Sequence, residues 1–332
     1  MKRFLFASIL FAVSAGMQAQ EKLPVYLDDS QPIEDRVQDA LSRMTVEEKA
    51  RLSYAQGKFS SPGCPRLGIP ELWYSDGPHG VRAEINWNDW GYAGWTSDSC
   101  TAFPALTCLA ATWNVELSGE YGKALGEEAV YRGKDVQLGP GVNIYRTPLN
   151  GRNFEYFSED PYVTGCFAAA VTRGIKKGGS FATVKHFAAN NQETARHTVD
   201  SVVSERALRE IYLKGFEIAV KESAPVAIMT SYNRVNGVHA ANSRALCTVI
   251  AREEWGFDGV LMSDWSTTAP EDGSIPWKCI EAGNDLIMPG SEKDDADIRQ
   301  AYADGRLSEK KIRLCAGRII SLINKLDKKT KK

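Results

Sequence analysis

Short apolar runs along the chain repeatedly end in polar residues of the kinds that carry chemistry. Four such runs, at residues 72–74, 182–184, 226–229 and 260–262, lead into Ser75-Asp76, Lys185-His186, Ser231-Tyr232-Asn233 and Ser263-Asp264-Trp265. Apolar runs this short, separated by helix-length segments, are typical of buried parallel strands. Reactive side chains at the carboxyl ends of such strands form the active face of a (β/α)8 barrel. The pattern therefore predicts an α/β fold and points to an enzyme.

The same periodicity predicts the individual elements. Strands are expected at residues 73–75, 136–138, 181–186, 226–231, 260–263 and 285–288. Helices are expected in two pieces within 33–55, and at 115–131, 162–176, 205–221, 245–255 and 309–326. Thr45 and Glu48 form a capping-box pattern, which places the start of the second early helix at Val46. Since six strands are identified, we expect a TIM-like barrel with an imperfect or missing strand.

A doubly wound sheet would use the same alternation of strands and helices and also binds ligands at carboxyl strand ends. Its phosphate-binding signature is missing, because no Gly-x-Gly-x-x-Gly follows the first strand. Gly139-Pro140-Gly141 instead opens a long loop with no helix start behind it. The loop at 87–101, rich in Trp, Gly, Asp and Ser, is expected to form a rim that contacts substrate.

The two ends of the chain have their own composition. Lys2 and Arg3 precede an apolar stretch at 4–13, and Ala19 offers a small residue before a cleavage point, so residues 1–19 are predicted to be a secretory signal peptide. The stretch is short for a membrane span. We therefore expect an exported protein, periplasmic or secreted and without a membrane segment after cleavage. A barrel domain is expected over 20–326 and a disordered Lys-rich tail over 327–332.

Composition narrows the classes of partner. The 332 residues are 43% hydrophobic and 25% charged, with a formal net charge of −2, which is ordinary for a soluble globular protein. The balance leaves no basic surface suited to nucleic acid and favours a neutral partner. Seven cysteines without any Cys-x-x-Cys spacing argue against a zinc site.

Asp264 is the strongest candidate for a reacting group. It follows an apolar strand and precedes Trp265, so its carboxylate is expected at the barrel mouth beside an indole. Retaining glycoside hydrolysis needs such a carboxylate as nucleophile, with an acid on the other side of the glycosidic bond. Taken alone, an Asp at a strand end is more often a helix cap or a hydrogen-bond organiser.

Other polar residues suit the hydroxyls of a sugar. Lys185 and His186 supply two adjacent donors where a core would place apolar side chains. Arg152 can hold a hydroxyl or orient a carboxylate, or can form a loop salt bridge with Glu155 or Asp160. Asp76 can bridge vicinal hydroxyls, or simply cap its own turn.

Longer motifs carry a family resemblance. Seven motifs occur in the following order along the chain: Asp76-Gly77-Pro78-His79-Gly80-Val81-Arg82, Gly139 to Ile144, Gly151 to Pro161, Lys185-His186-Phe187, Asn191-Gln192-Glu193, Met229 with Ser231-Tyr232-Asn233, and Ser263-Asp264-Trp265. Together they closely resemble glycoside hydrolase family 3 in its β-glucosidase branch, over nearly all of the chain after residue 19.

The resemblance implies a (β/α)8-like barrel that performs exo-acting, retaining hydrolysis of terminal β-D-glucosyl residues in a β-glucoside or oligosaccharide, without cofactor or metal. Asp264 would be the nucleophile. The substrate-binding residues would be Asp76, Arg82, Arg152, Lys185, His186, Arg196, Met229, Tyr232 and Trp265. Tyr232 could also hydrogen-bond the nucleophile, and Trp265 could face the apolar side of the sugar. Met229 and Tyr232 could alternatively be plain barrel core.

Two departures from the family pattern leave alternatives open. Members of this branch carry the acid/base glutamate in a second α/β sandwich domain, which we expect to be absent here, so the acid/base is unknown and a separately encoded sandwich-domain protein is an expected partner. Single-domain N-acetylglucosaminidases use a His-Asp dyad, but Ala188-Ala189-Asn190 and Val202 replace the residues around it. The remaining alternatives are a sugar-binding barrel without independent turnover, a β-xylosidase and a β-N-acetylhexosaminidase.

Overall fold

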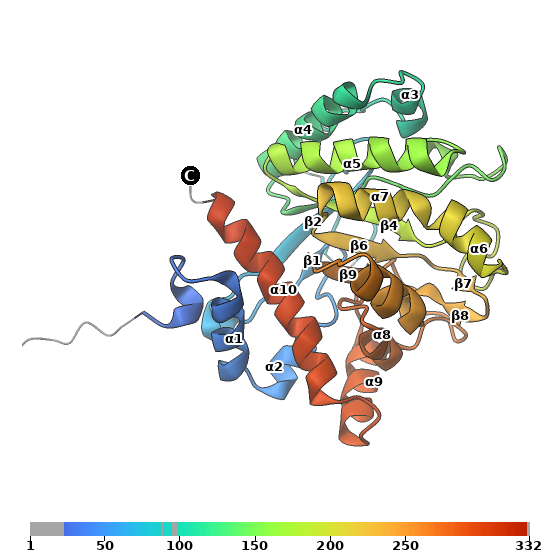
Figure 1. Ribbon diagram of the computed structural model, residues 1–332. Helices are drawn as coiled ribbons and strands as arrows, with labels where there is room; N and C mark the ends of the chain where they lie inside the picture. Colours follow the sequence, from blue (N-terminus) through green and yellow to red (C-terminus); the bar gives the residue numbers. More distant parts are fainter. Residues whose placement is uncertain (1–22, 88, 95–98, 331–332) are drawn as a thin grey trace, which may run out of the picture.

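The fold is α/β, with a curved sheet surrounded by helices (Figure 1). The computed structural model describes residues 23–87, 89–94 and 99–330. The segment predicted to be a signal peptide, residues 1–19, lies outside the described residues.

The described elements follow one another in the alternation that the sequence predicts. The strands are β1 Ser60–Ser61, β2 Leu72–Asp76, β3 Val136–Leu138, β4 Phe181–Phe187, β5 Asp200–Ser201, β6 Ala227–Thr230, β7 Arg234–Val235, β8 Val238–His239 and β9 Val260–Ser263. The α-helices are α1 Ile33–Arg43, α2 Val46–Arg51, α3 Leu106–Ala110, α4 Val115–Tyr131, α5 Pro161–Lys177, α6 Glu205–Ala207, α7 Lys214–Ser223, α8 Pro276–Ala282, α9 Glu292–Ala303 and α10 Glu309–Thr330. Short 3-10 turns occupy Val25–Leu27, Pro65–Leu67, Asn153–Glu155 and Ala240–Asn242, and π-helical turns occupy Leu208–Tyr212 and Ala245–Glu254.

Six strands form the main sheet in the order β1-β2-β3-β4-β6-β9, parallel from β2 onward, with β1 antiparallel to β2. Isolated bridges continue the pairing beyond β9: Met262 to Leu286, Tyr54 to Ile287, and Gly57 to Ser60 of β1. The two edges of the sheet are therefore linked to each other. A second, three-stranded sheet consists of β5, which comes after β4 in the chain, and of β7 and β8, which come after β6.

Successive side chains of each strand point alternately to an outer core beneath the helices and to an inner core inside the curved sheet. Val184 of β4 and Ile228 of β6 belong to the core beneath the outer helices, as expected for a strand whose successive side chains point to opposite faces. Their neighbours Lys185 and Met229 point to the inner face, where they stand in register with Met262 of β9. Lys185 is thus delivered into the interior of the curved sheet because it follows Val184 by one residue.

Helices cover the outer face of the sheet (Figure 1). Helix α5 packs against both α4 and α7, and the red α10 packs beside the blue α1 and α2. The predicted capping box is confirmed: Glu48 N–H donates to Thr45 Oγ1 at 3.2 Å, and Thr45 N–H donates to Glu48 Oε2 at 2.9 Å. None of the helices in the described ranges is both long and apolar enough to cross a membrane.

Three predicted elements differ from the structure. The helix expected over 205–221 is divided into α6, a π-helical turn and α7, because Leu213 N–H bonds to Leu208 O five residues back. The helix expected over 245–255 is π-helical. The strand expected at 285–288 is reduced to isolated bridges, since the Asp285 carboxylate accepts the Leu261 N–H at 2.9 Å in place of a backbone carbonyl.

At the carboxyl end, the backbone stays helical to Thr330. Residues 327–330 of the predicted tail therefore belong to α10, and residues 331–332 lie outside the described part of the chain.

Candidate active site

One pocket gathers every predicted site residue. About 250 Å³ in volume, it lies at the carboxyl ends of β2, β4, β6 and β9, as the sequence predicts. Its walls include the ten predicted residues Asp76, Arg82, Arg152, Lys185, His186, Arg196, Met229, Tyr232, Asp264 and Trp265, together with Phe59, Trp90 and Glu155. The chemical roles assigned to these residues stay predictions.

The turn after β2 positions Asp76. Gly77 N–H donates to Asp76 Oδ1 at 2.9 Å, and Arg82 N–H donates to the Asp76 carbonyl at 3.0 Å. Gly77 has φ +115°, and a Cβ there would lie 2.0 Å from the Gly80 carbonyl oxygen, so the turn requires glycine. Asp76 does cap its own turn, and the same Oδ1 also accepts from Lys185 Nζ at 2.8 Å in the pocket. The two roles predicted as alternatives therefore coexist.

Neighbouring charges and hydrogen bonds keep the Asp76 carboxyl ionised. Burial raises the pKa of the Asp76 carboxyl, but the charge and hydrogen bond of Lys185, the Gly77 N–H and the charge of Arg152 together outweigh burial, so the pKa is lowered overall. The Asp76 side chain keeps 41% of its surface exposed, so solvent partly screens this ion pair. Asp76 is thus a charged acceptor near the pocket opening.

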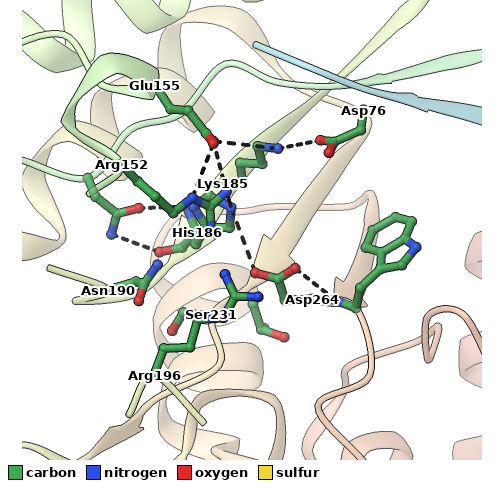
Figure 2. A network of polar contacts seen from close by, with 12 residues as sticks. Asp76, Arg152, Glu155, Lys185, His186, Asn190, Arg196, Ser231 and Asp264 are labelled. Atoms are coloured by element: carbon green, nitrogen blue, oxygen red, sulfur yellow. Dashed lines mark hydrogen bonds and ion pairs between the residues drawn. The ribbon is translucent and has the colours of Figure 1, made fainter. Parts of the chain in front are cut away.

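Arg152 precedes the 3-10 turn Asn153–Glu155 and forms a two-point ion pair with Glu155, at 3.1 Å from Nε to Oε1 and 2.8 Å from Nη2 to Oε2. The salt bridge with Glu155 predicted as an alternative exists, but inside the pocket wall (Figure 2). Asp160 instead caps α5, accepting from the N–H groups of Tyr162 and Val163.

His186 is a neutral donor–acceptor. Burial lowers the pKa of the imidazole well below its usual range, and the charges of Arg152 and Lys185 lower it further. Arg152 Nη2 lies 2.8 Å from Nε2. Because a guanidinium has only donors, Nε2 must accept, which places the imidazole proton on Nδ1, 3.1 Å from the Tyr156 hydroxyl. The Asn143 side chain holds the His186 backbone: its Nδ2 donates to the His186 carbonyl at 3.0 Å, and its Oδ1 accepts the His186 N–H at 2.7 Å.

Asp264 follows β9 and is 5% exposed. Its Oδ1 accepts the Trp265 N–H at 2.7 Å. Its Oδ2 accepts no well-formed hydrogen bond from the described residues and lies 3.7 Å from His186 Nε2. Burial raises the pKa of Asp264, with Arg152 and Lys185 opposing that rise, and the Tyr232 hydroxyl lies near enough to lower it slightly. The Tyr232 hydroxyl thus faces the Asp264 carboxylate, and a hydrogen bond between them contributes to the pKa of each group.

Arg196 and Tyr232 form another side of the pocket. The Arg196 guanidinium lies 4.3 Å from the centre of the Tyr232 ring and bonds to Glu193 at 2.9 Å. Burial raises the pKa of the Tyr232 hydroxyl, and the negative charge of Asp264 adds to the rise. Met229 is 1% exposed and belongs to the inner core as well as to the pocket wall, and its contact with a sugar stays a prediction.

Aromatic rings line the side of the pocket beside Trp265. Phe59 lies 5.2 Å from Trp265 and 6.1 Å from Trp90, measured between ring centres. The Arg82 guanidinium lies over both Phe59 and Trp90. Trp90 belongs to the loop predicted to form a rim, of which residues 88 and 95–98 lie outside the described part.

Phe59 was not predicted to lie in the site, whereas Trp90 belongs to the loop at 87–101 that was predicted to contact substrate. Phe59 directly precedes β1, whose antiparallel pairing with β2 brings it to the pocket, and no periodic signal marks so short a strand. Glu155 was predicted as a salt-bridge partner of Arg152. Within the described ranges, no group of three or more His, Cys, Asp or Glu side chains could hold a metal ion.

A curved α/β sheet with a small, polar, carboxylate-containing pocket at its carboxyl strand ends defines an enzyme scaffold. The family model for the glycosyl hydrolase family 3 N terminal domain matches residues 64–322, and the chain belongs to this family.

Among curated relatives, the beta-glucosidase BoGH3A of Bacteroides ovatus is 64% identical over 269 residues, which cover 80% of this chain and 36% of the relative. An exo-alpha-(1->6)-L-arabinopyranosidase of Bifidobacterium longum is 44% identical over 85% of this chain and 36% of its own length. The solved structure of beta-glucosidase 3B from Thermotoga neapolitana in complex with glucose matches with a TM-score of 0.81 and 41% identity, covering 88% of this chain and 43% of that one. The chain thus spans about a third of the length of these two curated relatives.

Proposed function

We propose that the protein hydrolyses β-glucosidic bonds at the non-reducing end of glucosides or oligosaccharides with retention of configuration, using Asp264 as the nucleophile. The observation that carries this proposal is the Asp264 carboxylate, buried in the pocket with Oδ2 lacking a well-formed hydrogen bond and with Arg152, Lys185 and Arg196 around it. A pocket of about 250 Å³ is smaller than the cavities that hold drug-sized ligands, which favours a single terminal sugar and exo action.

The pocket's own carboxylates do not supply an evident acid. Of the three in the described lining, Asp76 bonds to Lys185 and Glu155 to Arg152, so both serve as acceptors. We propose that the proton donor to the leaving group comes from outside this set, such as a separately encoded sandwich-domain protein. We also propose a (β/α)8-like barrel with imperfect strands, supported by the bridges that link the sheet edges. We further propose that the protein is exported, because residues 1–19 have the pattern of a signal peptide.

A second candidate is an exo-acting α-L-arabinopyranosidase, because one relative at 44% identity bears that name. A pentopyranoside lacks the hydroxymethyl arm of a hexose but presents a similar ring to the same pocket.

A panel of dinitrophenyl and nitrophenyl glycosides tests these proposals, covering β-D-glucosides, β-D-xylosides, N-acetyl-β-D-glucosaminides and α-L-arabinopyranosides. We expect β-D-glucosides to react fastest, with β-glucose as the first product by NMR. For the chain alone, dinitrophenyl glucoside should react readily and cellobiose hardly at all, since a positioned acid contributes about 10²- to 10⁴-fold. Glucose binding without turnover of dinitrophenyl glucoside would favour a sugar-binding barrel. Fast cleavage of cellobiose would show that an acid is already present.

A further inference from the structure

Glu155 joins two cations of the pocket that come from different parts of the fold. Its carboxylate receives both donors of the Arg152 guanidinium, and its Oε2 also lies 3.9 Å from Nζ of Lys185 on β4 (Figure 2). The Glu155 side chain is 12% exposed. The ion pair between Glu155 and Arg152 is therefore largely enclosed. An ion pair on the surface would contribute little to stability or orientation.

Each of the two cations also contacts another residue predicted to bind the sugar. Arg152 reaches His186 Nε2 at 2.8 Å, and Lys185 reaches Asp76 Oδ1 at 2.8 Å. A continuous line of polar contacts thus runs from His186 through Arg152, Glu155 and Lys185 to Asp76 (Figure 2). Glu155 is the central member of this line.

We propose that Glu155 is a positioning residue that sets the orientation of Arg152 and Lys185 toward the sugar and limits the positive charge acting on Asp264. This inference rests on the proposed function for the identity of the sugar. The effect of Glu155 on the charge around Asp264 does not depend on which sugar binds.

The charges around Asp264 show why this balance matters. Arg152, Lys185 and Arg196 act on Asp264 as cations, whereas His186 and Tyr232 beside it are neutral. Glu193 offsets Arg196 at 2.9 Å and lies 3.9 Å from Arg152. Glu155 offsets Arg152 and Lys185, which are the two cations that most oppose the raised pKa of Asp264.

Loss of the Glu155 charge would therefore stabilise the carboxylate form of Asp264 and lower its pKa. A less basic carboxylate is a weaker nucleophile, and its protonation would limit activity only at lower pH. Loss of the two-point contact would also free Arg152 to rotate, which weakens binding of the sugar.

Two substitutions separate charge from orientation. Glu155→Gln keeps the size of the side chain and removes the charge, whereas Glu155→Asp keeps the charge and shortens the reach. Glu159→Gln is the matched control, because Glu159 is exposed in the same segment. The readouts are the Asp264 carboxyl titration by ¹³C NMR, glucose affinity by calorimetry, and KM and kcat for dinitrophenyl β-D-glucoside.

For Glu155→Gln we expect the Asp264 titration and the acid limb of kcat/KM to move down by about half a pH unit or more. We expect KM to rise about tenfold or more. Glu155→Asp should raise KM while leaving the Asp264 titration near its wild-type position, and Glu159→Gln should change nothing.

An unchanged Asp264 titration together with unchanged glucose affinity in folded Glu155→Gln would overturn the inference. If Glu155→Gln does not fold, Glu155→Asp decides, because wild-type KM in that variant would exclude the orienting role. Absence of turnover in the wild-type chain would count against the proposed function, whereas the titration would still decide the role of Glu155.

Discussion

The backbone amide of Trp265 donates a 2.7 Å hydrogen bond to Oδ1 of Asp264 and thereby orients the carboxylate. The Ser263 hydroxyl fixes the same segment, since it donates to the Asp264 carbonyl and accepts the Met288 N–H, both at 2.9 Å. The other carboxylate oxygen, Oδ2, accepts no well-formed hydrogen bond from the described residues, so it is the oxygen proposed to attack the sugar.

Asp264→Asn should reduce turnover of dinitrophenyl β-D-glucoside by more than about 10³-fold, because an amide cannot form the glycosyl-enzyme. Steady-state kinetics would measure the loss. Asp258→Asn is the control: that carboxylate is 80% exposed and pairs with Lys325, and its loss should leave turnover unchanged. Undiminished turnover in Asp264→Asn would remove the nucleophile assignment.

The same substitution should stabilise the fold near neutral pH. Burial raises the pKa of Asp264 above its ordinary value of 3.8, so the native state binds more protons than the unfolded state between those two values. Wild-type stability therefore falls as pH rises through that window and stays reduced above it. Asp264→Asn removes this loss, so its Tm at pH 7 should exceed the wild-type Tm by on the order of 2 °C. Below pH 3.8 the two proteins should melt alike, and a wild type that melts higher at pH 7 would refute the argument.

Much of the site could be predicted because its residues sit on a regular frame. Strand alternation alone assigns Lys185 and Met229 to the inner face, and the parallel order of the strands brings their carboxyl ends to one place. Arg82, Arg196 and Tyr232 lie outside these strands and were expected from the family resemblance, and they line the same pocket.

What escaped prediction depends on contacts that no local pattern records. Phe59 reaches the pocket because it precedes a two-residue antiparallel strand, which has no periodic signal in the sequence. The segment at 285–288 has the apolar pattern of a strand, yet the Asp285 side chain replaces part of its ladder. The break between α6 and α7 likewise follows from a single i→i−5 backbone bond at Leu213.

Substitution of Asp76 should weaken sugar binding without unfolding the protein. Asp76→Ala removes an acceptor of Lys185 and a proposed acceptor of sugar hydroxyls. The expected loss in glucose binding is about 1–2 kcal/mol, toward the low end for bonds to charged groups because the side chain is 41% exposed. Calorimetry would detect this as a Kd about five- to thirtyfold weaker. Unchanged affinity with an unchanged melting curve would reduce Asp76 to a turn cap.

Asp285 should be essential for the stability of the fold, because it holds the sheet where regular strand pairing fails. Its carboxylate is fully buried and accepts from Arg252 at 2.6 Å, Arg318 of α10 at 2.8 Å and the Leu261 N–H at 2.9 Å. Asp285→Asn leaves both guanidinium groups without their anion, and breaking a buried pair costs about 3–5 kcal/mol. Urea unfolding should show a midpoint well below that of wild type. The exposed pair of Asp304 and Arg306 provides the contrast, since Asp304→Asn should leave the midpoint nearly unchanged. Equal midpoints for the two variants would mean that backbone bridges alone close this side of the sheet.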